Sequence, residues 1–63
     1  MESLWQRYLE AQALYEAWPS ELSAARAVKA YEAWSREYCP RLSARLTESL
    51  RRNYRTDLKK HAA

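Results

Sequence analysis

Apolar residues recur every three or four positions through the first third of the chain, which is the spacing of one face of an α-helix. Glu, Gln and Arg occupy about half of the positions between them, and Trp5, Leu9 and Leu14 widen the apolar face. Pro19 follows this pattern, and the residue before a proline avoids the helical conformation. The pattern therefore predicts a first helix over about residues 2–18. Its apolar positions are Leu4, Tyr8, Ala11, Tyr15 and Trp18.

A second helix is predicted between the two prolines. Ser20 is a suitable N-cap, and Glu21 lies at the positive end of the helix dipole. Apolar residues then repeat at helical spacing until Pro40 interrupts the pattern. We therefore expect a helix over about residues 20–38. Its apolar positions are Ala24, Ala27 or Val28, Tyr31, Trp34 and Tyr38.

The last third of the chain carries a third apolar stripe. Its members recur at every fourth residue, at Leu42, Leu46, Leu50, Tyr54 and Leu58. Proline is tolerated in the first turn of a helix, so the third helix is predicted over about residues 40–60. If the Cys39–Pro40 junction only kinks the chain, the second and third helices form one long bent helix, and two chains pair into a bundle.

The tetrapeptide Tyr-Glu-Ala-Trp occurs twice, at residues 15–18 and 31–34. On one unbroken helix the two copies would face opposite sides, because the offset between them leaves a rotation of about 160°. A fold-back at the first proline changes this geometry, because it sets the two helices side by side. That hairpin predicts two pairs of rings, Tyr8 with Tyr31 and Trp5 with Trp34.

The same hairpin sets the first copy of the repeat against small residues. Tyr15 and Trp18 fall opposite the stretch Ala24–Ala27, and large rings pack well against alanines. Each Tyr/Trp pair is therefore predicted to fill one end of the hairpin core.

These elements predict an all-α fold for residues 1–63, a small three-helix bundle in which the C-terminal helix packs across a helical hairpin. The chain contains no glycine, which disfavours β-hairpins, and one cysteine, which excludes an internal disulfide. A chain of this length buries only about 60% of its unfolded surface and is marginally stable alone. We therefore expect a homodimer.

Three tryptophans and five tyrosines supply all the aromatic rings. Their polar groups suit half-buried positions and interfaces. Two interpretations stay open: the rings fill the core of a small domain, or some of them form exposed anchors that hold a partner. The candidates are Trp5, Tyr8, Tyr15, Trp18, Tyr31, Trp34, Tyr38 and Tyr54.

Positive charge is concentrated at the C-terminal end. Residues 1–18 carry one arginine against three glutamates, and residues 40–63 carry seven lysines and arginines against two acidic residues. On a helix the cations lie opposite the apolar stripe. Cations four residues apart repel one another there, and only the pair Glu48–Arg52 offsets this repulsion. This basic face either keeps the protein soluble or binds an anionic partner. Its members are Arg41, Arg45, Arg51, Arg52, Arg55 and Lys59.

Residues for catalysis or cofactor binding are scarce. Asp57 and His61 are spaced to pair on a helix, but they lie near the chain end. Cys39 has no histidine near it in the sequence that could activate its thiol. We therefore expect a small, half-buried apolar residue and not a nucleophile. The sequence contains no phosphate-binding glycine loop and no Cys/His cluster for a metal. We therefore expect a protein that is not an enzyme and has no catalytic, cofactor or metal site.

Two functions remain. In the first, the chain binds another protein with an acidic surface through Trp/Tyr anchors and the basic face, and modulates or inhibits it. In the second, it is a nucleic-acid-binding regulator that uses the basic face; the missing turn glycine weakens a helix-turn-helix interpretation. No apolar run is long enough for a membrane span, and the lone cysteine favours the cytoplasm.

Overall fold

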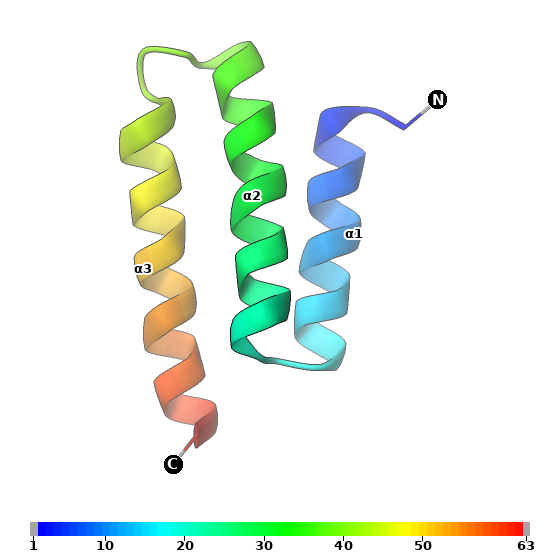
Figure 1. Cartoon of the computed structure of the whole chain (residues 1–63), viewed down its shortest axis with the longest axis vertical. Helices are drawn as coiled ribbons and strands as arrows, with labels where there is room; N and C mark the ends of the chain where they lie inside the picture. Colours follow the sequence, from blue (N-terminus) through cyan, green and yellow to red (C-terminus); the bar gives the residue numbers. More distant parts are fainter. Residues whose placement is uncertain (1, 63) are drawn as a thin grey trace.

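The computed structural model describes residues 2–62, in which three α-helices run alternately down and up (Figure 1). They are α1 (Leu4–Ala17), α2 (Glu21–Tyr38) and α3 (Ser43–Ala62). Helix α2 lies in the middle and contacts both others, whereas the backbones of α1 and α3 do not meet. The Cα atoms span 36 × 27 × 12 Å. The all-α prediction is confirmed for this part of the chain, which contains no strand.

Serine side chains fix the beginnings of the first two helices. The hydroxyl of Ser3 accepts a hydrogen bond from the backbone N–H of Gln6 at the start of α1. At the start of α2, Ser20 and Ser23 form a capping box in which each side chain accepts from the other residue's backbone N–H. The prediction of Ser20 as N-cap is therefore confirmed, with Ser23 in the position where glutamate or glutamine is usual.

The connection between α2 and α3 is a tight turn, so the alternative of one long bent helix is wrong. Helix α3 begins at Ser43 and not near Pro40. The backbone N–H of Leu42 donates to the Cys39 carbonyl at 3.0 Å, which closes the turn before the helix starts. Arg41 and Leu42 therefore lie outside α3.

The predicted hairpin of α1 and α2 forms as the repeat indicates. The ring centroids of Tyr8 and Tyr31 are 5.2 Å apart, and those of Trp5 and Trp34 are 5.0 Å apart. Both predicted ring pairs are confirmed. Aromatic rings at such separations stabilise beyond their buried area by about 0.5–1.5 kcal/mol per pair.

The buried core is small and combines two rings with small aliphatic side chains. Its apolar members are Tyr15, Ala24, Ala27, Val28 and Tyr54. The expectation that Tyr15 packs on the alanines of α2 is confirmed. The same expectation for Trp18 is wrong, because α1 ends at Ala17 and Trp18 takes a non-helical backbone conformation that leaves it 73% exposed.

Two tyrosines join α1 to α3 across α2, an arrangement we call the tyrosine clasp. The Tyr15 hydroxyl of α1 donates to the Asp57 carboxylate of α3 at 2.6 Å, and the Tyr54 hydroxyl of α3 donates to Gln12 of α1. The two rings meet edge to face, with centroids 4.6 Å apart. Helix α3 therefore lies beside α2 and reaches α1 through side chains, where we had expected it to pack across the whole hairpin.

Hydroxyl groups fill much of the contact between α2 and α3. The Oγ atoms of Ser35 and Ser43 are hydrogen-bonded at 2.7 Å, and Ser35 is fully buried. Thr47 is also buried, but its hydroxyl has no hydrogen-bond partner within residues 2–62. A buried hydroxyl without a partner costs about 1–3 kcal/mol, so Thr47 is a weak point of this interface.

Replacement of Thr47 by valine keeps the branched shape and removes the unpaired hydroxyl. We expect Thr47→Val to raise the free energy of unfolding by about 1 kcal/mol, measured by urea denaturation followed by circular dichroism. Ser35→Ala is the contrasting variant: it leaves the Ser43 hydroxyl without its partner and should lower the same quantity by about 1–3 kcal/mol. A Thr47→Val protein less stable than its parent would contradict this view of the interface.

Candidate functional site

All six members of the predicted basic face are exposed. Arg41 lies in the turn before α3, and the other five lie along the helix. Glu48 forms its ion pair with Arg51, three residues later, at 2.9 Å. The expected ion pair between Glu48 and Arg52 is not formed. Within residues 2–62, the remaining five cations of the basic face form no ion pair. Most of this positive charge is therefore available to a partner.

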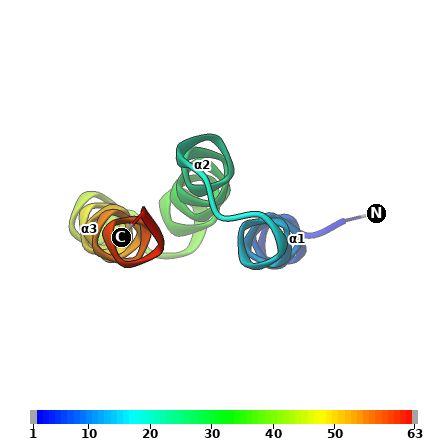
Figure 2. The ribbon, with the colours of Figure 1, turned by 90° about the horizontal axis from the view of Figure 1, so that it is seen from below.

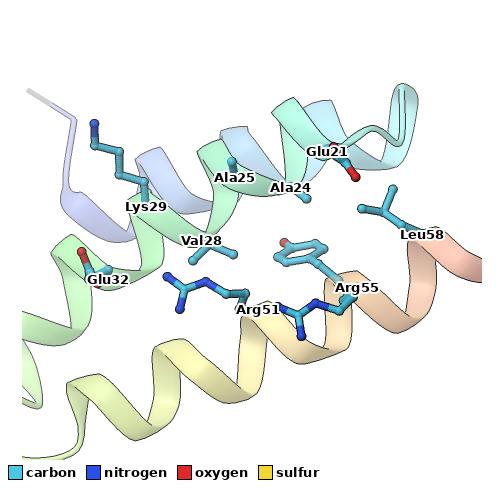
Figure 3. Close-up of a pocket in the computed structure, with 10 residues that line it drawn as sticks. Glu21, Ala24, Ala25, Val28, Lys29, Glu32, Arg51, Arg55 and Leu58 are labelled. Carbon is cyan, nitrogen blue, oxygen red and sulfur yellow. The ribbon is translucent and has the colours of Figure 1, made fainter.

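Two of these arginines stand at the edge of a groove between α2 and α3, which we call the arginine groove (Figure 3). Its volume is about 480 Å³. Arg51 and Arg55 come from α3, and the guanidinium of Arg51 reaches toward Val28 on α2. Small and apolar side chains form much of the lining, so the groove offers hydrophobic contact beside positive charge. Its other lining residues are Glu21, Ala24, Ala25, Val28, Lys29, Glu32, Tyr54 and Leu58.

Trp18 is a largely exposed ring that lies close in sequence to the arginine groove. It lies in the turn before α2, and Glu21 of the groove follows three residues later. The Ser23 hydroxyl donates to the Trp18 carbonyl at 2.9 Å, which fixes the backbone of the turn. Leu22 next to Glu21 is also exposed.

Five other rings form a continuous group on the hairpin, here called the aromatic cluster. Trp5 contacts Tyr8 and Trp34, and Tyr31 contacts Tyr8 and Trp34, with centroids 5.0–5.6 Å apart. Tyr38 continues the group from Trp34 at 5.9 Å. Trp5 is 42% exposed and Tyr38 is 64% exposed. The cluster is thus part core and part surface.

The eight aromatic residues therefore divide between the two interpretations that the sequence left open. Tyr15 and Tyr54 belong to the core and Trp18 belongs to the surface. The aromatic cluster combines both roles. Helical spacing identified the rings that face the hairpin, but the exposure of Trp18 depends on where α1 ends, which the spacing alone does not give.

Titratable side chains of α1 and α3 meet at the Asp57 end of the tyrosine clasp. Asp57 accepts from Tyr15, and His61 Nε2 lies 3.4 Å from the same carboxylate oxygen. Burial, then the hydrogen bond and charge of Asp57, raise the pKa of Tyr15 to about 12. Burial also raises the pKa of Tyr54. Both phenols hold their protons at neutral pH and act as structural hydrogen-bond donors.

The part of the chain that the structure describes contains no group of three or more His, Cys, Asp or Glu side chains that could hold a metal ion. Cys39 is a free, half-buried thiol. None of the helices in residues 2–62 combines the length and the apolar character needed to cross a membrane. The exposed features described above are the basic face with its groove, Trp18 and part of the aromatic cluster.

Comparison of the chain with protein-family models, with curated proteins and with solved structures gives no match.

The raised pKa of Tyr15 predicts a loss of stability at alkaline pH. Tyr15 is 4% exposed, and its ordinary pKa of 10.0 in the unfolded chain lies below its pKa of about 12 in the folded state. The unfolded chain therefore loses this proton first as the pH rises. The contribution of Tyr15 is complete below pH 10 and falls by up to about 1.4 kcal/mol per pH unit between pH 10 and 12.

We expect Tyr15→Phe to be less stable than the parent at neutral pH and to lose stability less steeply above pH 10. Urea denaturation at several pH values measures both quantities. Tyr38→Phe is the matched control, since Tyr38 is largely exposed. If the free energy of unfolding falls equally steeply above pH 10 in the parent and in Tyr15→Phe, the raised pKa of Tyr15 is contradicted.

Proposed function

We propose that this protein is a small non-enzymatic interaction protein that binds an acidic segment of another protein and modulates or inhibits it. The observation that carries the proposal is the arginine groove, in which Arg51, Arg55 and Lys29 outnumber the carboxylates of Glu21 and Glu32 beside apolar side chains. Arginine binds carboxylates through two parallel hydrogen bonds and keeps its charge at all relevant pH values. The partner surface that suits this site is therefore acidic and amphipathic.

The shape of the groove favours a helical partner segment. Ala25 is a short and exposed side chain of the lining, which allows another helix to approach this part of α2 closely. Carboxylates on the partner helix would then reach Arg51 and Arg55. Apolar residues at helical spacing would contact the lining, as in other helix-in-groove complexes.

Trp18 supplies the hot spot of the proposed interface. Tryptophan and arginine are the residues most enriched among those that dominate binding energy. Trp18 lies three residues before Glu21, a lining residue of the groove, and the Ser23 hydroxyl bonds to its backbone carbonyl. We propose that a partner in the groove extends past Glu21 and covers the indole. The affinity of such an interface depends on Trp18 and the arginines together.

The test is a pull-down from nuclease-treated lysate with four immobilised proteins. We expect a partner recovered by the parent to be lost with Trp18→Ala and with Arg51→Ala/Arg55→Ala, each through a loss of affinity of about tenfold or more. The matched control is Arg7→Ala/Arg26→Ala, which removes the same charge outside the basic face and should keep the partner. Recovery that is equal for all four proteins would contradict the proposal.

A nucleic-acid-binding regulator is the second candidate function. Five cations of the basic face are without an ion pair within residues 2–62, and phosphate contacts require no more than exposed cations. A helix-turn-helix geometry does not support this candidate, because that motif crosses its helices at about 90–120°, whereas α2 and α3 lie side by side (Figure 1). Binding would therefore run through phosphates and not through base edges.

The two candidates differ in their response to salt. If the second is correct, the protein binds duplex DNA with an affinity that falls steeply as salt rises, with a log–log slope of about −0.9 for each phosphate contacted. Arg51→Ala/Arg52→Ala/Arg55→Ala should abolish this binding, and Trp18→Ala should leave it unchanged. Fluorescence anisotropy with a labelled duplex measures both. Absence of binding at low salt would contradict this candidate.

We also propose that the protein works as a homodimer in a reducing compartment such as the cytoplasm. The chain buries a core of only five apolar residues within residues 2–62, and association is a common way for so small a domain to gain stability. The free thiol of Cys39 suits a reducing compartment.

A further inference from the structure

We infer that the partner segment of the arginine groove is a helix with two carboxylates one turn apart, one of which binds Arg55 while the other replaces Glu48 at Arg51. This inference rests on the proposed function and goes beyond it, because it names the arrangement of the partner's charges and a competitor for one arginine within this chain. It depends on the spacing of the groove residues and on the ion pairs around them.

One wall of the groove is a single row of α3 side chains (Figure 3). Arg51, Arg55 and Leu58 all line the groove and follow one another at intervals of four and three residues, so they share one flank of the helix. Four residues of an α-helix rise about 6 Å. The wall therefore presents two arginines one turn apart, followed by an apolar side chain.

In the part of the chain that the structure describes, no third helix covers the groove. Helix α1 supplies none of the lining residues, and Figure 2 shows α1 and α3 on opposite sides of α2. Residues 2–62 also contain no strand to which an extended segment could add. A helix satisfies its own backbone hydrogen bonds in such a groove, whereas an extended segment does not. The groove therefore favours a helical occupant.

The carboxylates of the groove itself are largely offset. The Arg36 guanidinium, outside the lining, lies 3.6 Å from the Glu32 carboxylate. Glu21 lies in the first turn of α2, where the positive end of the helix dipole offsets its charge. Lys29 on the same wall forms no ion pair within residues 2–62. The field in the groove is therefore positive and favours carboxylates on the occupant.

The two arginines of the groove differ in their partners. The Nη1 atom of Arg51 donates to the Glu48 carboxylate at 2.9 Å, whereas Arg55 forms no ion pair within residues 2–62. Arg51 and Glu48 are both about half exposed, and exposed ion pairs contribute little to stability. A carboxylate of the occupant can therefore bind Arg55 directly, and a second carboxylate can replace Glu48 at Arg51.

The segment that matches this wall carries two acidic residues four positions apart and an apolar residue one turn beyond them. The acidic residues then face Arg51 and Arg55, and the apolar residue faces Leu58. Each guanidinium can hold a carboxylate through two parallel hydrogen bonds. Glu48 competes with one of these carboxylates and so weakens the complex.

A synthetic peptide tests the spacing. It carries the pattern Leu-x-x-Glu-x-x-x-Glu-x-x-Leu, which is the same from either end, in a background of alanine and glutamine. A length of about 18 residues allows a helix in water. The control peptide has its second glutamate two residues after the first, on the other side of the helix. We expect it to bind the full chain at least about tenfold more weakly, measured by fluorescence anisotropy of the labelled peptides.

Variants of the full chain test the residues. Arg55→Ala should weaken binding of the first peptide about tenfold or more. Arg52→Ala is the matched control, because Arg52 is exposed on α3 but does not line the groove. Glu48→Gln should strengthen binding about two- to fivefold, and should have no effect in Arg51→Ala. Circular dichroism checks that each variant keeps its helices.

The outcomes separate this inference from the proposed function. Equal binding of the two peptides, or equal effects of Arg55→Ala and Arg52→Ala, overturns the inferred spacing. A Glu48→Gln protein that binds no more tightly than the parent overturns the role of Glu48. In each case a protein that the pull-down captures through the arginine groove leaves the proposed function standing.

Absence of peptide binding up to about 1 mM also overturns the inference. The occupant is then a nucleic acid if a labelled DNA duplex binds and Arg55→Ala weakens its binding more than Arg52→Ala does. It is a second copy of the chain if sedimentation equilibrium shows a dimer that Arg55→Ala dissociates and Arg52→Ala does not.

Discussion

The tyrosine clasp is the interaction on which the rest of the structure depends. The backbones of α1 and α3 do not meet, so α3 is held to the hairpin by its contact with α2 and by two tyrosines that reach across it. Each ring belongs to one outer helix and its hydroxyl bonds to the other. The small residues Ala24 and Ala27 beneath them let both rings lie close to α2. A larger side chain at either position would push the outer helices apart.

Two side chains, and no close approach of the backbones, join the outer helices, so the layer of three helices stays open. On one side, the short residues of α2 leave the arginine groove between α2 and α3. The rings of Trp5, Trp34 and Tyr38 belong to the partly exposed aromatic cluster of the α1–α2 hairpin.

Helical spacing and two prolines were enough to predict the three helices, the ring pairs of the hairpin and the exposed basic face, since each depends on local periodicity. The clasp was not predictable, because the pairing of Tyr15 with Asp57 depends on where α3 sits along the hairpin. The Ser35–Ser43 bond was missed because serine carries no periodic signal. The position of Trp18 was wrong because α1 ends one residue before it, at Ala17. The Trp18 side chain therefore does not follow the helical spacing and is exposed.

The most direct test of the account is a nuclear Overhauser spectrum of the protein in solution. The clasp predicts cross-peaks between the ring protons of Tyr15 and Tyr54, whose centroids are 4.6 Å apart. It also predicts cross-peaks from these rings to the methyl groups of Ala24 and Ala27, which share their core. Cross-peaks of Tyr15 to α2 without any to Tyr54 would contradict the account, because α3 would then not be held against the hairpin.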